Sequence, residues 1–460
     1  MDGAISKWKN LTSGTPSWVS GNVRTIRFSN TVARELAKLI THNIDIKTEQ
    51  LYGSAEKALF IQSALGEHFL ENSQEIMENV ICYGGVMAKW NGKGIDYMKP
   101  DMFVVTEFDS NKNITGCIFF SYYAEGKKYY TRAEWHRFET IARKNEQTSE
   151  YETLNVYKIS NKSFISDDID ETGEEIPLSK TKWKDIQKET TIENLEHPLF
   201  AYIRNPYSNT VDSESPLGMS SFHECLEELR WLDIAMSNMG AETEVSAPIM
   251  FIDESAIRYA NNTGIKLPKF IKGLSMGVNQ SNTIEQWQPE LKVTSRIEGI
   301  NFYLSIIGYK CGFDPGYFVF NGQSIVVATA TQVEATERRT VNTVLSYRNL
   351  LDRPNINGEG RIGFVHDIAY VIDAMSTMNG EYNPSEYGNY KLYCDFSDLT
   401  ENAEEEKAFD YQLAMQGFMS KARFLVLHKG MTEEEAVAMV REAEEEKNNS
   451  VSNISLFGEE

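Results

Sequence analysis

Residues 294–351 decide the fold and read TSRIEGINFYLSIIGYKCGFDPGYFVFNGQSIVVATATQVEATERRTVNTVLSYRNLL. Ser295 and Glu298 form a capping box, which is typical of the first turn of a helix. Apolar residues then recur every three or four positions: Ile297, Ile300, Leu304, Ile307 and Cys311. This narrow stripe predicts a helix that packs against another helix. Gly312, with Pro315 just beyond it, predicts the end of that helix.

The segment Gly312–Val327 has no helical period, and its Asn321-Gly322 pair is a strong hairpin signal. A second capping box, Thr331 to Glu334, predicts a further helix that runs to about Leu351. Antiparallel helices are usually joined by about two to eight residues, and longer connections tend to be functional. The connection between these two helices is therefore the first candidate for a functional site.

This connection is also too apolar for a free loop tip. Its apolar residues are Tyr317, Phe318, Val319, Phe320, Ile325, Val326 and Val327. Three interpretations are open. The segment packs into the core of its own subunit, or a neighbouring subunit binds it, or it lines a lumen with Asn321, Gln323 and Ser324 at a polar tip.

A long helix is expected upstream, with Ser215 as its cap and Pro216 in its first position, running to about Glu244. Its apolar stripe consists of Phe222, Cys225, Leu226, Leu229, Leu232, Met236 and Met239. Residues 246–290 read as a small mixed segment punctuated by prolines. The only compact basic group there is Lys266, Lys269 and Lys272, which fits either a solvated face or a docking surface for a partner.

The N-terminal half changes from helix to strand. Residues 1–29 show little periodicity and read as an arm, and helical patterns follow near 30–46 and 54–83. From 84 to 205, short β runs separated by turn residues predict an antiparallel meander. The acidic run 167–175 resembles a calcium loop, but Ser179 stands where a bidentate glutamate is needed, so a hairpin tip is expected.

After residue 352 we expect a helix over Gly360–Met378, a strand over Tyr390–Phe396 and two or three helices between 400 and 447. The whole chain has 460 residues and a formal net charge of −22. A protein that grips DNA by its phosphates normally carries the opposite sign, whereas an acidic wall lets DNA slide. We find no transmembrane stretch and no secretory signal, and the five separated cysteines read as buried, reduced thiols.

The motifs of common enzyme classes are absent from the sequence. It has no phosphate-binding P-loop, no dinucleotide-binding glycine pattern, no zinc-binding His pair at helical spacing and no nucleophile elbow. We therefore predict no catalytic residue, no metal site and no cofactor.

The order of elements from Ser215-Pro216 onward resembles the portal proteins of long-tailed phages. The stretches Gly312–Gly322 and Ala328–Glu337 particularly resemble the tunnel-loop region of portals from phages of Gram-positive hosts. The order of helices and strands resembles these portals over about residues 30–450. The amino-acid sequence itself resembles them only near 199–245 and 311–340.

The resemblance implies an α+β subunit that assembles into a ring. Its parts would be an N-terminal arm (1–29), a wing of helices and antiparallel strands (30–215), two stem helices (216–245 and 292–312), a small α/β clip (246–291), a tunnel loop (313–328), wing helices and a strand (329–399) and a helical acidic crown and tail (400–460). Residues expected at the channel are Lys310, Tyr317, Phe318, Phe320, Asn321, Gln323 and Ser324. Since residues 312–337 contain no lysine, unlike the loop of some portals, we expect polar contact with DNA through Asn321 and Gln323.

The resemblance also implies a structural protein at one capsid vertex of the virion, assembled in the host cytoplasm, with no membrane partner. Such rings are dodecamers that serve genome packaging, head–tail joining and DNA ejection. Their partners are double-stranded DNA, the terminase large subunit, a head-completion or adaptor protein, and the major capsid and scaffolding proteins. Two alternatives stay open: a metal-dependent nucleic-acid-processing enzyme, and another phage structural protein such as a head–tail adaptor or baseplate protein.

Overall fold

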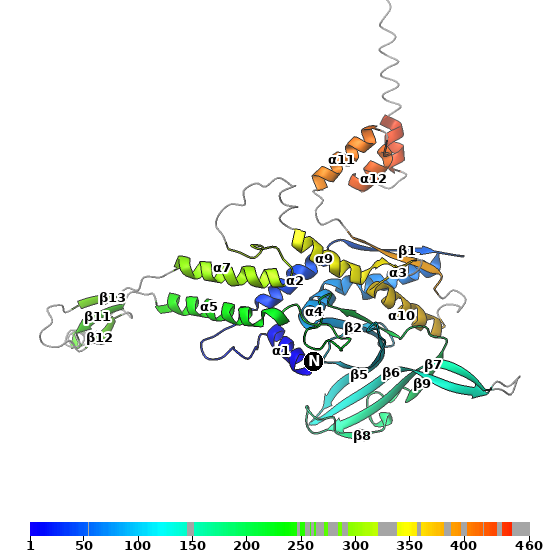
Figure 1. The fold of residues 1–460 in the computed structure, drawn as a ribbon, viewed down its shortest axis with the longest axis horizontal. Helices are drawn as coiled ribbons and strands as arrows, with labels where there is room; N and C mark the ends of the chain where they lie inside the picture. Colours follow the sequence, from blue (N-terminus) through cyan, green and yellow to red (C-terminus); the bar gives the residue numbers. More distant parts are fainter. Residues whose placement is uncertain are drawn as a thin grey trace, which may run out of the picture. The chain divides into compact units, whose positions relative to one another are not determined.

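The computed structural model describes residues 1–53, 55–144, 151–245, 249–253, 258, 262–263, 271–274, 284–287, 293–320, 338–356, 360–380, 388–396, 403–416, 418–429 and 435–443. The chain divides into two compact units, residues 1–325 with 336–397 and residues 326–335 with 398–460. Helices and mostly antiparallel sheets alternate in the first unit (Figure 1). The predicted α+β class agrees with this content.

The largest sheet, here called the wing sheet, is the predicted antiparallel meander. Its strands are β4 (Phe103–Phe108), β5 (Ile114–Glu125), β6 (Lys128–Lys144), β7 (Tyr151–Ser166) and β8 (Glu174–Ile176), in that spatial order, with β9 (Glu189–Glu193) also pairing with β7. Ile165 pairs with Glu174, so the acidic run closes a β-hairpin as expected. Among the residues that the structure describes, no group of acidic, histidine or cysteine side chains is placed to hold a metal ion.

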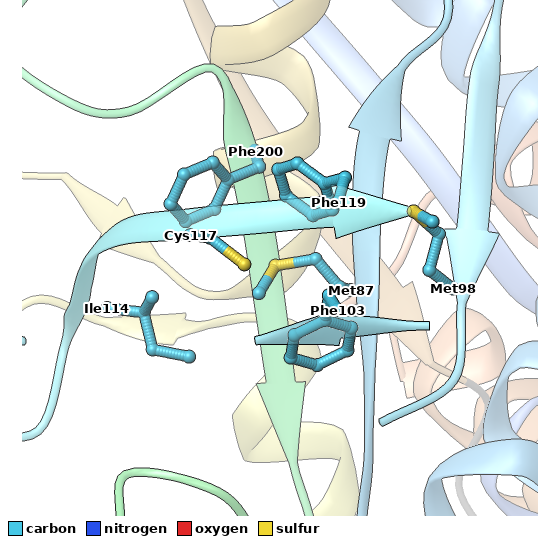
Figure 2. Close-up of a cluster of buried hydrophobic side chains, with 7 residues drawn as sticks. All are labelled: Met87, Met98, Phe103, Ile114, Cys117, Phe119 and Phe200. Atoms are coloured by element: carbon cyan, nitrogen blue, oxygen red, sulfur yellow. The ribbon is translucent and has the colours of Figure 1, made fainter. Parts of the chain in front are cut away.

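A small sheet packs against the wing sheet and closes its core. It contains β10 (Phe200–Arg204), β2 (Gly85–Trp90) and β3 (Ile95–Met98) in that order. Figure 2 shows the buried cluster contributed by both sheets: Met87, Met98, Phe103, Ile114, Cys117, Phe119 and Phe200. Strand β2 is buried on both faces, since Val86 and Ala88 beside Met87 are buried too, whereas β5 is more exposed towards its end.

The first 29 residues are not an irregular arm, and that prediction was wrong for half of them. Residues Asp2–Ser13 form helix α1, whose buried residues Ile5, Trp8 and Leu11 recur every third position. Gly14 ends the helix in the left-handed conformation, with φ of 82°. The spacing of the three apolar residues was present in the sequence, but the stripe is too short to stand out.

The next two predicted helices are also interrupted. Helix α2 (Phe28–Ile40) stops early because Asn43, with φ of 49°, turns the chain into strand β1 (Ile44–Gln50). Strand β1 pairs with the predicted strand Tyr390–Phe396, here β16. The expected helix over 54–83 is split into α3 (Glu56–His68) and α4 (Ser73–Tyr83) by a 3-10 turn, since Asn72 and Ser73 favour helix ends over interiors.

The helix expected from Ser215 begins later, at Leu226, after a 3-10 turn over His223–Cys225. Residues before it are held in turns against the start of β2. Gly218 passes so close to Gly84 that a Cβ atom on Gly218 would lie 1.9 Å from the Gly84 carbonyl oxygen. Ser221 N–H also donates to the Ile81 carbonyl. This close backbone approach outweighs the helix-starting signal of Ser215 and Pro216.

The remaining helices and strands of the first unit follow along the chain. They are α5 (Leu226–Val245), β11 (Ile249–Asp253), β12 (Ile271–Leu274), β13 (Ile284–Trp287), α7 (Val293–Lys310), α9 (Arg338–Leu351), β14 (Arg353–Pro354), β15 (Arg361–Ile362) and α10 (Phe364–Met378). Strands β11–β13 form one sheet, in which β11 pairs parallel with β12 and antiparallel with β13. In the second unit α11 (Ala403–Gln416) packs against α12 (Lys421–Lys429) through Tyr411 and Phe424, and residues 435–443 are helical too.

Candidate functional site

Helices α5 and α7 form an antiparallel pair, called the helical pair below, which Figure 1 draws side by side. Two ion pairs join them, Glu228 with Lys310 (Oε1 to Nζ, 2.6 Å) and Glu242 with Arg296. Glu228 and Glu242 are fourteen positions apart on α5, and Arg296 and Lys310 are fourteen positions apart on α7. The two helices therefore run side by side over about four turns. At one end the thiols of Cys225 and Cys311 are 4.0 Å apart and buried, as free cysteines.

The predicted stripe of α7 is confirmed as the seam of this pair. Ile300, Leu304 and Ile307 are buried, as is Cys311 just after the helix. Other apolar side chains of the pair remain accessible. Trp231 on α5 is 47% exposed, and Phe302 and Tyr309 on α7 are 62% and 48% exposed. Phe302 and Tyr309 are seven residues apart, and two turns of helix place them on one face.

The segment between α1 and α2 crosses α5 and is fastened to it. The buried carboxylate of Asp233 accepts hydrogen bonds from Trp18 Nε1 and from the Ile26 amide, each at 2.9 Å. The Ser237 hydroxyl oxygen accepts a hydrogen bond from the Arg24 amide at 2.9 Å, while its hydrogen is donated to the Asp233 carbonyl at 2.7 Å. Sequence reasoning missed this strap, because a single aspartate in a helical stripe gives no signal of a partner about 200 residues away.

Gly312 ends α7 in a conformation that only glycine adopts readily here. Its φ is +94°, and a Cβ atom would lie 2.5 Å from Thr343 Oγ1 and 2.8 Å from the Tyr207 hydroxyl. Thr343 Oγ1 donates to the Gly312 carbonyl at 2.9 Å, which joins the end of α7 to α9. The sequence predicted this helix end correctly, and the structure adds the reason for glycine.

Residues 313–320 follow α7 and are not helical, as predicted. Phe318 packs edge-on against Phe28 of α2, with ring centroids 5.3 Å apart, and against Phe313 at 4.8 Å. The Tyr317 hydroxyl donates to Glu35 Oε1 at 2.8 Å. Tyr317 is nevertheless 40% exposed and Phe318 is only partly buried, so these contacts lie at the surface of the subunit, and the three interpretations stay open.

Phe320 differs from its neighbours because its side chain is 72% exposed. Its backbone is nevertheless held by Asn301 of α7. The Phe320 amide donates to Asn301 Oδ1 at 3.0 Å, and Asn301 Nδ2 donates to the Phe320 carbonyl at 3.3 Å. The structure thus brings Tyr317, Phe318 and Phe320 together beside α7 and α2. Asn321, Gln323 and Ser324 lie outside the described residues.

The lysines named from the sequence, Lys310 for the channel and Lys266, Lys269 and Lys272 for docking, lie in different parts of the chain. Lys310 donates to Glu228 and to the Glu224 carbonyl at 2.7 Å, so its ammonium group serves the helical pair. Lys272 lies in β12, where its backbone is opposite Phe251 of β11. Lys266 and Lys269 lie outside the described residues. A docking role for the three lysines stays a prediction.

The wing sheet holds a separate cluster of buried ionisable groups. The Glu134 carboxylate accepts hydrogen bonds from Lys89 Nζ at 2.6 Å, Arg132 Nη2 at 2.8 Å and His136 Nε2 at 2.9 Å. Burial would raise the pKa of Glu134, but the His136 hydrogen bond and the two cations outweigh it and hold that pKa well below its usual range.

Burial lowers the pKa of His136, which therefore stays neutral and accepts a hydrogen bond at Nδ1 from the Tyr157 hydroxyl at 2.8 Å. With its ring bonded at both nitrogens, this histidine serves the packing of the sheet. The arrangement is structural, and it supplies no free nucleophile or base for a reaction.

Comparisons with known proteins give little guidance. No protein-family model matches the chain, and no curated protein matches it. A solved structure described as "Neck of empty GTA particle computed with C6 symmetry" contains a similar chain, with a TM-score of 0.43 and 9% identity over 92% of this chain and 93% of that one. Similarity at this level decides neither fold nor function. Among the described helices, none is long and apolar enough to cross a membrane.

Proposed function

We propose that this chain is a subunit of a phage portal ring, a structural protein that forms the DNA channel at one vertex of the virion. In this proposal α5 and α7 are the stem helices, β11–β13 belong to the clip, and the segment after α7 is the tunnel loop. The ring would serve packaging, head–tail joining and ejection, and would contact terminase, an adaptor protein, and the capsid and scaffolding proteins.

One observation carries the proposal: contacts within the subunit hold α5 against α7, but aromatic side chains on both helices stay exposed, where a neighbouring subunit could cover them. Two ion pairs and a buried seam hold α5 against α7. Phe302 and Trp231 nevertheless stay about half exposed or more. Large aromatic residues are enriched in interfaces between subunits. A ring of copies would cover both faces of each pair.

The charge of the chain supports a channel that does not bind DNA tightly. The sequence carries 67 acidic and 45 basic residues. Lys310, the lysine nearest the proposed tunnel loop, is neutralised by Glu228. A wall of this kind repels phosphates, so that DNA slides past it.

The mass of the assembly tests the proposal. Twelve subunits of 52.4 kDa give a particle of about 630 kDa, which native mass spectrometry or sedimentation would detect. Replacing Phe302 by serine should abolish or strongly weaken assembly, because it removes an interface aromatic. Leu59→Ser is the matched control, since Leu59 is 61% exposed on α3, away from the helical pair. The control should assemble normally.

Two results would count against a portal ring. The first is a chain that stays monomeric or dimeric at high concentration, or assembles equally well with Phe302→Ser. The second is metal-dependent DNA cleavage by the pure protein that a single carboxylate change abolishes, which would favour the enzyme alternative. Images of the particle down its axis distinguish a ring with an open channel from an adaptor without one.

A further inference from the structure

The ends of α7 and α9 cap each other across the segment that joins them. Helix ends leave about four amide N–H groups at the start and four carbonyl groups at the finish without partners inside the helix. Asp314, four residues after α7, supplies acceptors to the start of α9. Arg339, in the first turn of α9, supplies donors to the end of α7. Each helix therefore provides what the other lacks.

At the start of α9, Asp314 caps the helix: its carboxylate accepts hydrogen bonds from the first amide N–H groups, as an N-cap residue does. Its Oδ2 accepts hydrogen bonds from the Thr340 amide at 3.0 Å and the Thr340 hydroxyl at 2.8 Å. Its Oδ1 accepts from the Arg339 amide at 3.3 Å, and its own amide donates to Thr340 Oγ1 at 3.0 Å. Aspartate is among the preferred N-cap residues, and its negative charge also suits the positive end of a helix dipole.

At the α7 end, the Arg339 guanidinium donates twice to the Tyr309 carbonyl, from Nε at 3.2 Å and from Nη2 at 2.9 Å. The same group lies 3.9 Å from the centroid of the Tyr309 ring. A cation at the carbonyl end of a helix is favourable to its dipole. Together with the bond from Thr343 to the Gly312 carbonyl, this fastens α7 to α9 at adjacent points.

We propose that Asp314 and Arg339 form a reciprocal cap that makes the end of α7 and the start of α9 one rigid corner, and that Asp314 is the positioning residue for residues 315–320, which follow it. Opening the corner at either helix end would then release the other. The inference concerns the subunit itself and does not require the ring.

Amide hydrogen exchange in the full-length protein tests the cap where it acts. In Asp314→Ala the amides of Arg339 and Thr340 lose their acceptors, and their exchange should speed up roughly five- to thirtyfold. Asp314→Asn should keep the exchange of Thr340 close to wild type, because the one amide oxygen of asparagine can still accept there, whereas the Arg339 amide loses its acceptor and should exchange faster. Asp109→Ala is the matched control, since Asp109 likewise accepts amides of a turn, those of Asn111 and Asn113, but between β4 and β5.

Limited chymotrypsin digestion gives a second readout. Tyr317, Phe318 and Phe320 are cleavage sites just inside the corner, and cleavage there needs the local chain to open. Asp314→Ala should raise the cleavage rate at these residues, whereas Asp109→Ala should not. Unchanged exchange and cleavage in Asp314→Ala would overturn the reciprocal cap, and so would an Asp314→Asn variant in which Thr340 exchanges as fast as in Asp314→Ala. The mass of the assembly reports on the proposed ring separately, because Asp314→Ala leaves Phe302 and Trp231 in place.

Discussion

The helical pair and the body that packs around α3, α10 and the wing sheet hold ion pairs at different depths. In the body, Lys57 of α3 and Asp373 of α10 form an ion pair in which each side chain is 1% exposed. In the helical pair, Lys310 and Glu228 are 32% and 21% exposed. The two ion pairs therefore differ in burial, whereas both regions expose large apolar side chains, such as Leu59 in the body and Phe302 in the helical pair.

From this difference we expect the body to determine the stability of the subunit and the helical pair to determine its assembly. A mutation in the body should lower the free energy of unfolding of the subunit and leave the assembly unchanged in any molecule that still folds. A mutation on the outer faces of the pair should do the reverse. The predictions below set the two regions against each other, from the largest expected effect to the smallest.

Replacing Lys57 by methionine should give the largest loss of stability. The change leaves the Asp373 carboxylate buried without its counter-charge, and breaking a buried ion pair from one side typically costs about 3–5 kcal/mol. Asp373 would keep only weaker support, such as the Gly388 amide at 2.8 Å. Denaturant unfolding of wild type and variant measures the loss.

A loss below about 1 kcal/mol for Lys57→Met would contradict the contrast between the regions. The double variant Lys57→Met with Asp373→Leu provides the control. It removes both charges, and it should recover much of the stability because no buried charge then lacks a partner.

Acid should destabilise the body through His136. Burial holds the folded-state pKa of this histidine below its ordinary value of 6.5. As the pH falls below about 6.5, the unfolded chain takes up a proton that the folded chain refuses, so the free energy of unfolding decreases. The decrease is at most about 1.4 kcal/mol for each pH unit and stops below the folded-state pKa. Glu134 does not interfere in this window, because its own contribution is lost only below about pH 4.5.

Unfolding curves between pH 7.5 and pH 5.5 measure this slope in wild type and in His136→Gln. The variant should show a shallower slope. His223, whose pKa burial also lowers, contributes to the pH dependence that remains, and Asp367, whose pKa burial raises to about 6, acts in the opposite direction in the same window. An identical slope in the two proteins would show that His136 titrates normally and that the buried network is not as drawn here.

The sequence was most informative where one element carries its own signal. The stripe of α7, the end at Gly312, the strand Tyr390–Phe396 and the meander were all predicted, because periodicity and turn residues are local properties. The failures came from distant contacts. The start of α5 was misplaced because Gly218 packs on Gly84, and α1 was missed because Trp8 is buried against His223 far along the chain.

The sequence named Tyr317, Phe318 and Phe320 as residues of a functional site, and that role stays a prediction. The residues that hold them in the structure, Glu35, Phe28 and Asn301, carry no motif. Residue spacing also could not predict that Asp314, which follows α7, caps the start of α9. A cap is recognised in a sequence only when it directly precedes its helix.

The smallest effect is expected for Lys310→Met, and it is the sharpest test of the contrast. The ion pair with Glu228 is partly exposed, and water already screens it, so its loss should cost about 1 kcal/mol or less. The methionine side chain keeps the apolar stem against α5, which limits any packing loss. Unfolding midpoints of Lys310→Met and Lys57→Met measured side by side give the comparison directly. If Lys310→Met proved as costly as Lys57→Met, the helical pair would be held by the same buried electrostatics as the body, and its open surface would not mark it as the region reserved for neighbours.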